Sequence, residues 1–217
     1  MKTLVICLAA LTIMSASVSV QAQATKKELK KELKDKAIRK ARVESRKFIK
    51  DGFYVAPGAL PLDKQLERAW MREVEVNEEG YPQYIIATGT SVAESQIAAR
   101  VQATETAKME LAGTIATDIA ALVENNIANQ QLNTEEAASV TKTVAAAKNI
   151  IAQELGRVIP LVEVYRKYNR TVEVNIRIAY DSKLAMDKAK TVVRKQLEQE
   201  TKIMQEKLDK LLNIDTL

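Results

Sequence analysis

The hydrophobic pattern before residue 80 predicts two helices joined by a rigid turn. Residues 25–50 contain no Gly or Pro, and their apolar positions form a narrow stripe along one helix face. The stripe consists of Leu29, Leu33, Ala37, Ala41 and Phe48. Because so thin a stripe is not typical of a buried helix, we expect this segment to be exposed. Residues 56–61 contain Pro and Gly and predict a rigid turn. A second helix is predicted after this turn, because apolar positions recur at helical spacing from residue 62 to about residue 75. These positions are Leu62, Leu66, Ala69 and Trp70.

The central part of the chain predicts one strand followed by two helices. Residues 84–90 are β-like, and Gly89 is expected where this strand ends. Residues 92–128 repeat large apolar side chains at helical spacing beside an alanine-rich flank, which predicts a long amphipathic helix. Thr134 is a candidate N-cap with acids in the following turn, and it predicts another helix that ends at Gly156.

Two strands and a helix complete the pattern. Residues 158–168 and 171–180 are separated by a short turn at Asn169, which predicts an antiparallel hairpin. The second of these strands alternates between apolar and polar residues, as expected of a strand with one covered face. Apolar residues at helical spacing from 182 to 212 predict one long C-terminal helix, and Glu200 interrupts its apolar seam.

Together these elements predict an α+β fold. Its three strands form a small antiparallel or mixed sheet that is covered on one face by long Ala-rich helices, with helical extensions at both ends. The predicted segments are a signal peptide at 1–22, a basic helical arm at 23–52, a linker with a short amphipathic helix at 53–80, the α+β domain at 81–190 and a C-terminal amphipathic helix extension at 191–217.

The first 22 residues have the three parts of a secretory signal peptide. Lys2 precedes an apolar run of about eleven residues, roughly half the length of a transmembrane helix, and compact residues follow up to Ala22. We therefore expect cleavage after Ala22 and no transmembrane span in the mature chain. Cys7 lies inside the apolar run rather than after it, so we expect no lipidation. The expected location is the periplasm or outer membrane of a Gram-negative bacterium, or the exterior.

Composition narrows the chemistry of the mature protein. The chain has no histidine, and its single cysteine, Cys7, belongs to the predicted leader. The mature chain therefore lacks disulfides and also lacks the commonest general base and zinc ligand. Nucleophile elbows, P-loops, dinucleotide-binding loops and zinc-protease motifs are missing from the sequence. We expect a protein that is not an enzyme and that uses no metal and no cofactor.

Several polar groups have an ordinary structural interpretation beside a chemical one. The hydroxyls of residues 88–91 suit a phosphate-binding turn, but they also suit helix caps, which we favour. The carboxylate pairs at residues 78–79 and 135–136 are expected at a turn and at a helix start. Glu163, Glu173 and Arg177 are expected to form a charge ladder across paired strands.

Charge is distributed unevenly along the chain. Residues 25–50 carry twelve Lys or Arg against four acids, a net charge of +8. Once Lys2 is also removed from the total of +5, residues 51–217 have a net charge of −4. The cations predicted to bind an anionic surface are Lys26, Lys27, Lys30, Lys31, Lys34, Arg39, Lys40, Arg42, Arg46 and Lys47. A solvated charged helix without a partner is the alternative.

Part of the chain resembles a known family. The resemblance lies in Ala87–Thr90, in the helix with Ala99, Ala103 and Ala107, in Arg157–Tyr165 and in Val172–Tyr180. Over about residues 85–182 these features resemble the Lpp-twenty-type domain of bacterial envelope lipoproteins. The whole chain, including Pro57–Leu62, is similar to secreted proteins of Bacteroides-like bacteria. The resemblance implies a cell-envelope location and transfers no catalytic residue.

These observations favour a non-enzymatic envelope module. Its partner is expected to be an anionic envelope surface or an acidic protein or glycan, and nucleic acid is not expected because the protein is exported. The alternative is a periplasmic holdase-type chaperone or assembly factor. For the C-terminal helix, packing within the chain is the ordinary interpretation, while Glu200 on the seam favours an extension that forms homo-oligomers beyond residue 200.

Overall fold

The structure is a computed structural model that describes residues 28, 29, 31–127, 129, 132–201, 203 and 205–214. The predicted signal peptide and three of the predicted binding cations, Lys26, Lys27 and Lys30, lie outside these residues. The fold is α+β, as the sequence pattern predicts.

Three antiparallel strands form the sheet, in the order β1-β3-β2. The strands are β1 (Tyr84–Ala93), β2 (Ile159–Tyr168) and β3 (Thr171–Asp181). The β2–β3 connection is the predicted hairpin, and Asn169 adopts the left-handed conformation at its turn (φ 53°). The predicted alternation along β3 is confirmed, because Val174, Ile176 and Ile178 are buried on the face that α3 covers.

Helix α3 (Gln96–Ile127) packs directly on that face of the sheet. Its fully buried Ala99, Ala103 and Ala107 recur every four residues, so the helix presents a ridge of methyl groups to the strands. At Gly89 an added Cβ would lie 1.9 Å from the carbonyl oxygen of Ala103 and 2.6 Å from the amide nitrogen of Ala107. The expectation that Gly89 ends the strand is therefore wrong. Gly89 lies in the middle of β1 because no side chain fits between the strand and the helix.

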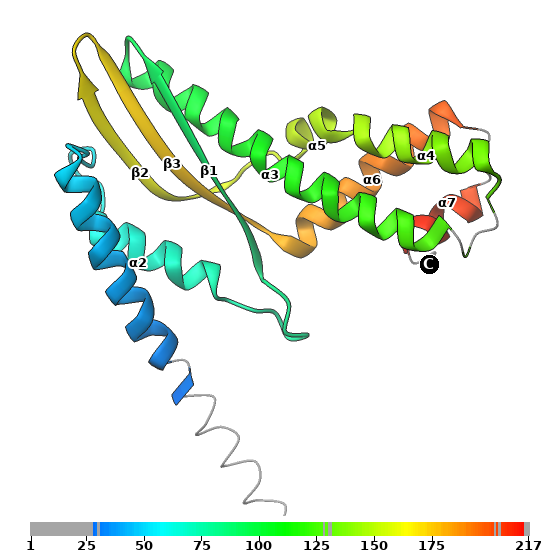
Figure 1. Ribbon diagram of the computed structural model, residues 1–217, viewed down its shortest axis with the longest axis horizontal. Helices are drawn as coiled ribbons and strands as arrows, with labels where there is room; N and C mark the ends of the chain where they lie inside the picture. Colours follow the sequence, from blue (N-terminus) through cyan, green and yellow to red (C-terminus); the bar gives the residue numbers. More distant parts are fainter. Residues whose placement is uncertain are drawn as a thin grey trace, which may run out of the picture.

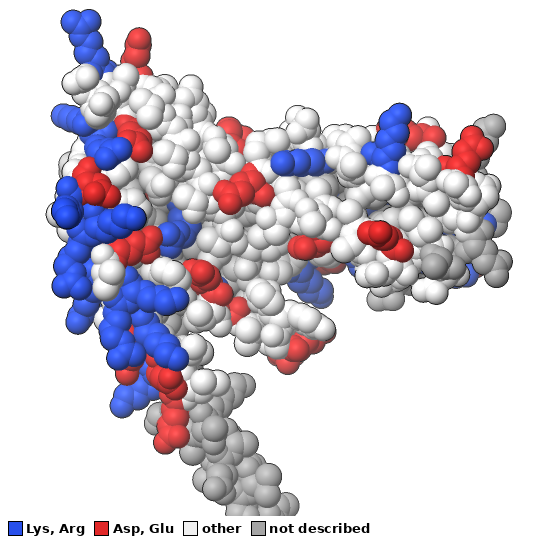
Figure 2. All heavy atoms as spheres, viewed as in Figure 1, with Lys and Arg blue, Asp and Glu red and all other residues white. Residues whose placement is uncertain are grey.

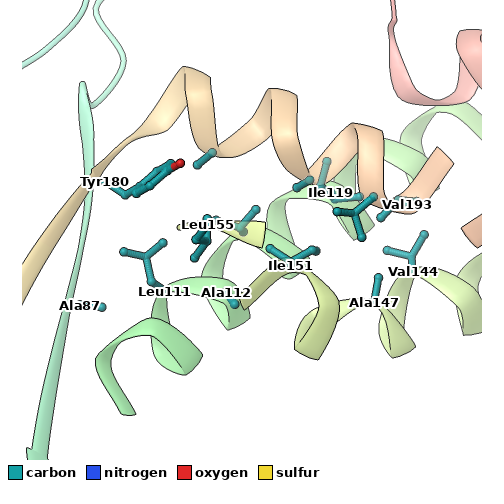
Figure 3. Packing of buried hydrophobic residues seen from close by; sticks show 14 of the residues in the cluster. Ala87, Leu111, Ala112, Ile119, Val144, Ala147, Ile151, Leu155, Tyr180 and Val193 are labelled. Carbon is teal, nitrogen blue, oxygen red and sulfur yellow. The ribbon is translucent and has the colours of Figure 1, made fainter. Parts of the chain in front are cut away.

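Four further helices continue the layer of α3 beyond the sheet (Figure 1). They are α4 (Thr134–Ala146), α5 (Lys148–Glu154), α6 (Ser182–Glu200) and α7 (Gln205–Leu212). Apolar side chains from these helices and from the sheet form one core, in which Leu111, Ile151 and Tyr180 lie close together (Figure 3). The core is built mainly from aliphatic side chains, as expected of a chain with 4% aromatic residues.

The predicted second helix is divided at Ala147 into α4 and α5. Asn133 rather than Thr134 is its N-cap: the Asn133 side chain accepts a hydrogen bond from the amide of Glu136, and the Glu136 carboxylate accepts one from the amide of Asn133. Gly156 follows the helix with a positive φ of 66°, which confirms the predicted end.

The prediction of a single C-terminal helix over 182–212 is wrong. Thr201 is extended and ends α6, and α7 folds back against α6 and α3. Leu208, Leu211 and Leu212 are thereby completely buried. An ion pair between Arg194 Nε and Asp209 Oδ1, 2.6 Å apart, joins the two helices. The chain reverses because the leucines of α7 leave water when they pack on the core, which a straight extension would not allow.

The opposite face of the sheet carries a second, smaller layer. It consists of residues 31–50, called the basic helix below, and of α2 (Leu62–Glu73). This layer and the sheet share a second apolar cluster that includes Ala41, Leu66 and Val164. The expectation that residues 25–50 form an unburied helix is therefore corrected, since part of the thin stripe packs on the sheet. The first turns of the basic helix project beyond the sheet (Figure 1).

Candidate anionic-surface interface

The basic helix has one packed face and one solvent face. Ala37, Ala41 and Ser45 are buried, and their spacing of four residues places them on the same side of the helix. These side chains are small, so the helix lies close to the layer beneath it. Phe48, which contacts Phe53 edge to face at 5.3 Å, packs at the C-terminal end of the helix.

The cations of the basic helix point to solvent. All nine that the structure describes are exposed, namely Lys31, Lys34, Lys36, Arg39, Lys40, Arg42, Arg46, Lys47 and Lys50. Lys and Arg side chains gather along the helix, with acidic side chains among them (Figure 2). Lys36 pairs with Glu32 at 3.0 Å, which lowers the pKa of the Glu32 carboxyl. Of the predicted binding residues, Lys31, Lys34, Arg39, Lys40, Arg42, Arg46 and Lys47 are thus brought together on one surface.

Glu44 links the basic helix to α2 and to strand β3. The Trp70 indole Nε1 donates a hydrogen bond to Glu44 Oε2 at 2.8 Å, and Arg177 Nη2 donates to Glu44 Oε1 at 2.6 Å. The side chains of Arg177 and Glu44 are only 17% and 21% exposed, so the pair is shielded from water. Arg177 was expected in a ladder with neighbouring strands, but its partner is on the basic helix.

A groove of about 470 Å³ runs between the basic helix and α2. Its walls are Arg39, Lys40, Val43, Glu44, Lys47 and Trp70. The Lys40 ammonium lies 4.1 Å from the centre of the Trp70 ring, a cation–π contact. Val43 is 61% exposed in the middle of the cations. The groove therefore combines an apolar lining with a positively charged rim.

A second hollow of about 400 Å³ lies beside Trp70 on the open part of the sheet. It is bounded by Trp70, Glu73, Tyr84, Ile86, Thr88 and Arg177. Arg72 stacks over the Tyr84 ring at 4.6 Å and donates a hydrogen bond to its hydroxyl at 2.9 Å. This hollow is polar, and Arg72 covers one face of the Tyr84 ring.

The other polar groups selected from the sequence are distributed over the sheet. Residues 88–91 lie within β1, so they form neither a phosphate-binding turn nor helix caps. The ladder prediction holds for Glu173, which accepts a hydrogen bond from Arg166 Nε at 2.9 Å on the paired strand. Glu163 instead contacts Arg100 of α3 at 3.1 Å and the hydroxyl of Tyr165.

Three residues of this site were not predicted as binding residues. Val43 and Glu44 belong to the same segment as the cations, and Trp70 was assigned to an apolar stripe. Val43 can be noted in the sequence as an apolar residue among Arg39, Arg42 and Arg46, but this position alone does not indicate binding. Trp70 could not be placed beside the basic helix without the tertiary structure.

The fold and the site define an α+β protein with a basic outer layer. Within the described residues, no helix has an apolar stretch long enough to cross a bilayer. Among the described residues, the acidic side chains form no cluster of three that could hold a metal ion. Comparison with protein-family models, curated proteins and solved structures gives no match.

Proposed function

We propose that the protein is a non-enzymatic interaction module whose basic helix docks on an anionic surface. The observation that carries this proposal is that the basic helix has a buried face of small residues and a solvent face of cations. Its small residues are buried, with Ala41 in the apolar cluster shared with the sheet, which fixes its orientation, while its nine described cations are exposed to solvent. A helix held in this way presents its charges without first losing conformational entropy, which favours binding.

The basic surface supports electrostatic attachment rather than nucleic-acid recognition. The sequence predicts export, and in the envelope the available polyanions are phospholipid headgroups, glycans and acidic proteins. Each Lys or Arg close to an anionic membrane contributes about 1 kcal/mol at physiological ionic strength. Binding through several such contacts is expected to be strong at low salt and reversible at high salt.

The test is a charge-removal triple variant on the solvent face. Arg42, Arg46 and Lys50 are exposed and do not line the groove, so R42Q/R46Q/K50Q leaves the packing and the groove unchanged. With about 1 kcal/mol for each cation, the variant is expected to bind vesicles containing phosphatidylglycerol roughly 100-fold more weakly than the parent. Vesicle co-sedimentation at 50 and 300 mM salt measures this.

The matched control removes the same charge elsewhere. Lys142, Lys183 and Lys195 are exposed on α4 and α6, and K142Q/K183Q/K195Q has the same net charge as the test variant. If both triple variants weaken binding equally, total charge rather than the basic helix is responsible and the proposal fails. Substitutions are preferable to deletion of the helix, because deletion would uncover Leu66 and Val164.

The location in the envelope is part of the same proposal. It rests on the leader predicted from residues 1–22. N-terminal sequencing of the protein from a cell fraction tests it, with Gln23 as the expected first residue. A soluble intracellular protein that retains residues 1–22 would contradict the location.

A further inference from the structure

The groove beside the basic helix has a property that electrostatic docking does not use. Its lining is made of the Val43 side chain, the Trp70 ring and the carbon stems of Arg39, Lys40 and Lys47. The groove has a volume of about 470 Å³ and is widely open to solvent. A binding surface that only attracted negative charge would gain nothing from an exposed apolar lining.

The charge at the groove is positive despite the presence of an acid. Glu44 is the acidic residue in the lining, and both of its carboxylate oxygens already accept hydrogen bonds, from Trp70 and from Arg177. Arg39, Lys40 and Lys47 are exposed residues of the same lining, and the Lys40 ammonium lies over the Trp70 ring. The groove thus combines apolar surface with three cationic residues.

We infer that this groove accepts part of an acyl chain of an anionic phospholipid, while the rim cations hold the phosphate. The inference rests on the proposed function and narrows its anionic surface to a lipid layer. The charge pattern matches such a lipid, which carries a negative headgroup directly above its chains. A glycan or an acidic protein offers negative charge but has no acyl chain that could contact the apolar lining beside Val43.

Lys40 is the side chain that must adapt. Its ammonium lies over the Trp70 ring, and an exposed cation–π contact is weak. A lysine can move its ammonium toward a phosphate while its carbon stem stays on apolar surface. This movement would open the face of Trp70 to the acyl chain without breaking the Glu44 hydrogen bonds.

The first measurement uses the fluorescence of Trp70, which is the single tryptophan of the chain. The purified protein with its native N terminus is mixed with phosphatidylglycerol vesicles whose acyl chains are brominated near the headgroup. Bromine quenches tryptophan on contact, so we expect emission from Trp70 to fall on binding. Vesicles with unbrominated chains give the reference signal.

The second measurement compares two substitutions on the basic helix. Val43 lines the groove, whereas Ile49 is 60% exposed and lies six residues further on, roughly 120° around the helix. V43S is expected to weaken vesicle binding about tenfold, since it removes most of the valine side chain that the acyl chain would cover on binding. I49S is expected to bind within twofold of the parent. Both positions are exposed. The two variants and the parent have the same N terminus, so any contribution of the N terminus to vesicle binding is equal in all three.

The outcomes separate this inference from the proposed function. Quenching together with a selective loss in V43S supports the groove. Vesicle binding without quenching, or equal losses in V43S and I49S, overturns the groove and leaves electrostatic docking intact. Binding to heparin or an acidic protein but not to vesicles overturns the lipid assignment while the basic surface stands. Failure to bind any of these polyanions overturns both proposals.

Discussion

The two faces of the sheet are covered in different ways. On the face under α3, the backbone of a helix meets the backbone of a strand at Gly89, and the core that continues from there is aliphatic. On the other face, the basic helix and α2 cover part of the sheet through a small apolar cluster and through charged and polar contacts. The groove and the hollow beside Trp70 both lie in this second layer.

This difference separates a closely packed face under α3, which stabilises the fold, from an outer layer that exposes the groups proposed to bind. Close packing over the face under α3 leaves little freedom, because changes of even one methyl group are felt there. The outer layer is held by fewer apolar contacts and by side-chain hydrogen bonds, so it leaves cations, an indole and an apolar groove accessible. Binding proteins commonly place variable, accessible elements on a rigid scaffold in this way.

The largest expected effect comes from filling the close contact under α3. G89A places a methyl group 1.9 Å from a backbone oxygen of α3, so the helix must shift, and we expect a loss of about 3 kcal/mol in the free energy of unfolding. Urea denaturation measures this. Gly113 of α3 is the matched control, because a Cβ there meets the flexible end of Lys148 at 3.0 Å. G113A is expected to be neutral or to stabilise by up to about 1 kcal/mol. Similar losses in both variants would show that the contact at Gly89 is not tight.

A smaller effect is expected from breaking the charged link of the outer layer. E44Q leaves the partly buried Arg177 without its counter-charge, and we expect a loss of about 2 kcal/mol. The emission maximum of Trp70 should shift as well, because its indole N–H loses a charged acceptor. E75Q removes the partner of Arg72 in a more exposed pair and is expected to cost less than about 0.5 kcal/mol. An unchanged Trp70 spectrum in E44Q would contradict the described link.

A buried glutamine contributes to the attachment of α2 to the edge of the sheet. Gln65 Oε1 accepts a hydrogen bond from the amide of Glu163 at 2.9 Å, and its Nε2 donates to the carbonyl of Leu60 at 2.8 Å. Q65M keeps the length of the side chain but leaves both groups unpaired, with an expected loss of about 1–2 kcal/mol. Hydrogen exchange should show reduced protection of the Glu163 amide. Q102M, at an exposed glutamine that accepts a hydrogen bond from Ser91, should change stability by less than about 0.5 kcal/mol.

A separate prediction concerns alkaline pH. Burial raises the pKa of Tyr165 to about 12, and the hydrogen bond from its hydroxyl to Glu163 acts in the same direction. Between pH 10 and 12 the folded state keeps a proton that the unfolded chain releases, so the contribution of Tyr165 to stability is complete below about pH 10 and is lost as pH rises toward 12. Thermal unfolding of the parent and of Y165F over this range tests the prediction. The decline should be shallower in Y165F, and parallel curves would exclude a role for this tyrosine.

Several features of the fold follow from the sequence alone. Alternation in β3 and helical spacing in α2 and α3 indicate which side chains are buried. These periods follow from the local geometry of strands and helices, so the sequence alone reveals them. The hairpin at Asn169 and the helix end at Gly156 require a left-handed residue, which the chain supplies at those positions. The concentration of positive charge in residues 25–50 is likewise a property of the sequence itself.

Other features depended on contacts between distant segments. The place of Gly89 in the strand became clear only from the backbone of α3, because a glycine in isolation is equally compatible with a turn. The reversal before α7 arises because the core accepts Leu208, which a seam pattern cannot reveal. The groove needs Val43 and Trp70 from two helices that meet only when both pack on the sheet. Local sequence indicates which segments form helices and strands, whereas apolar burial between segments decides where the C-terminal helix breaks and which surfaces remain for binding.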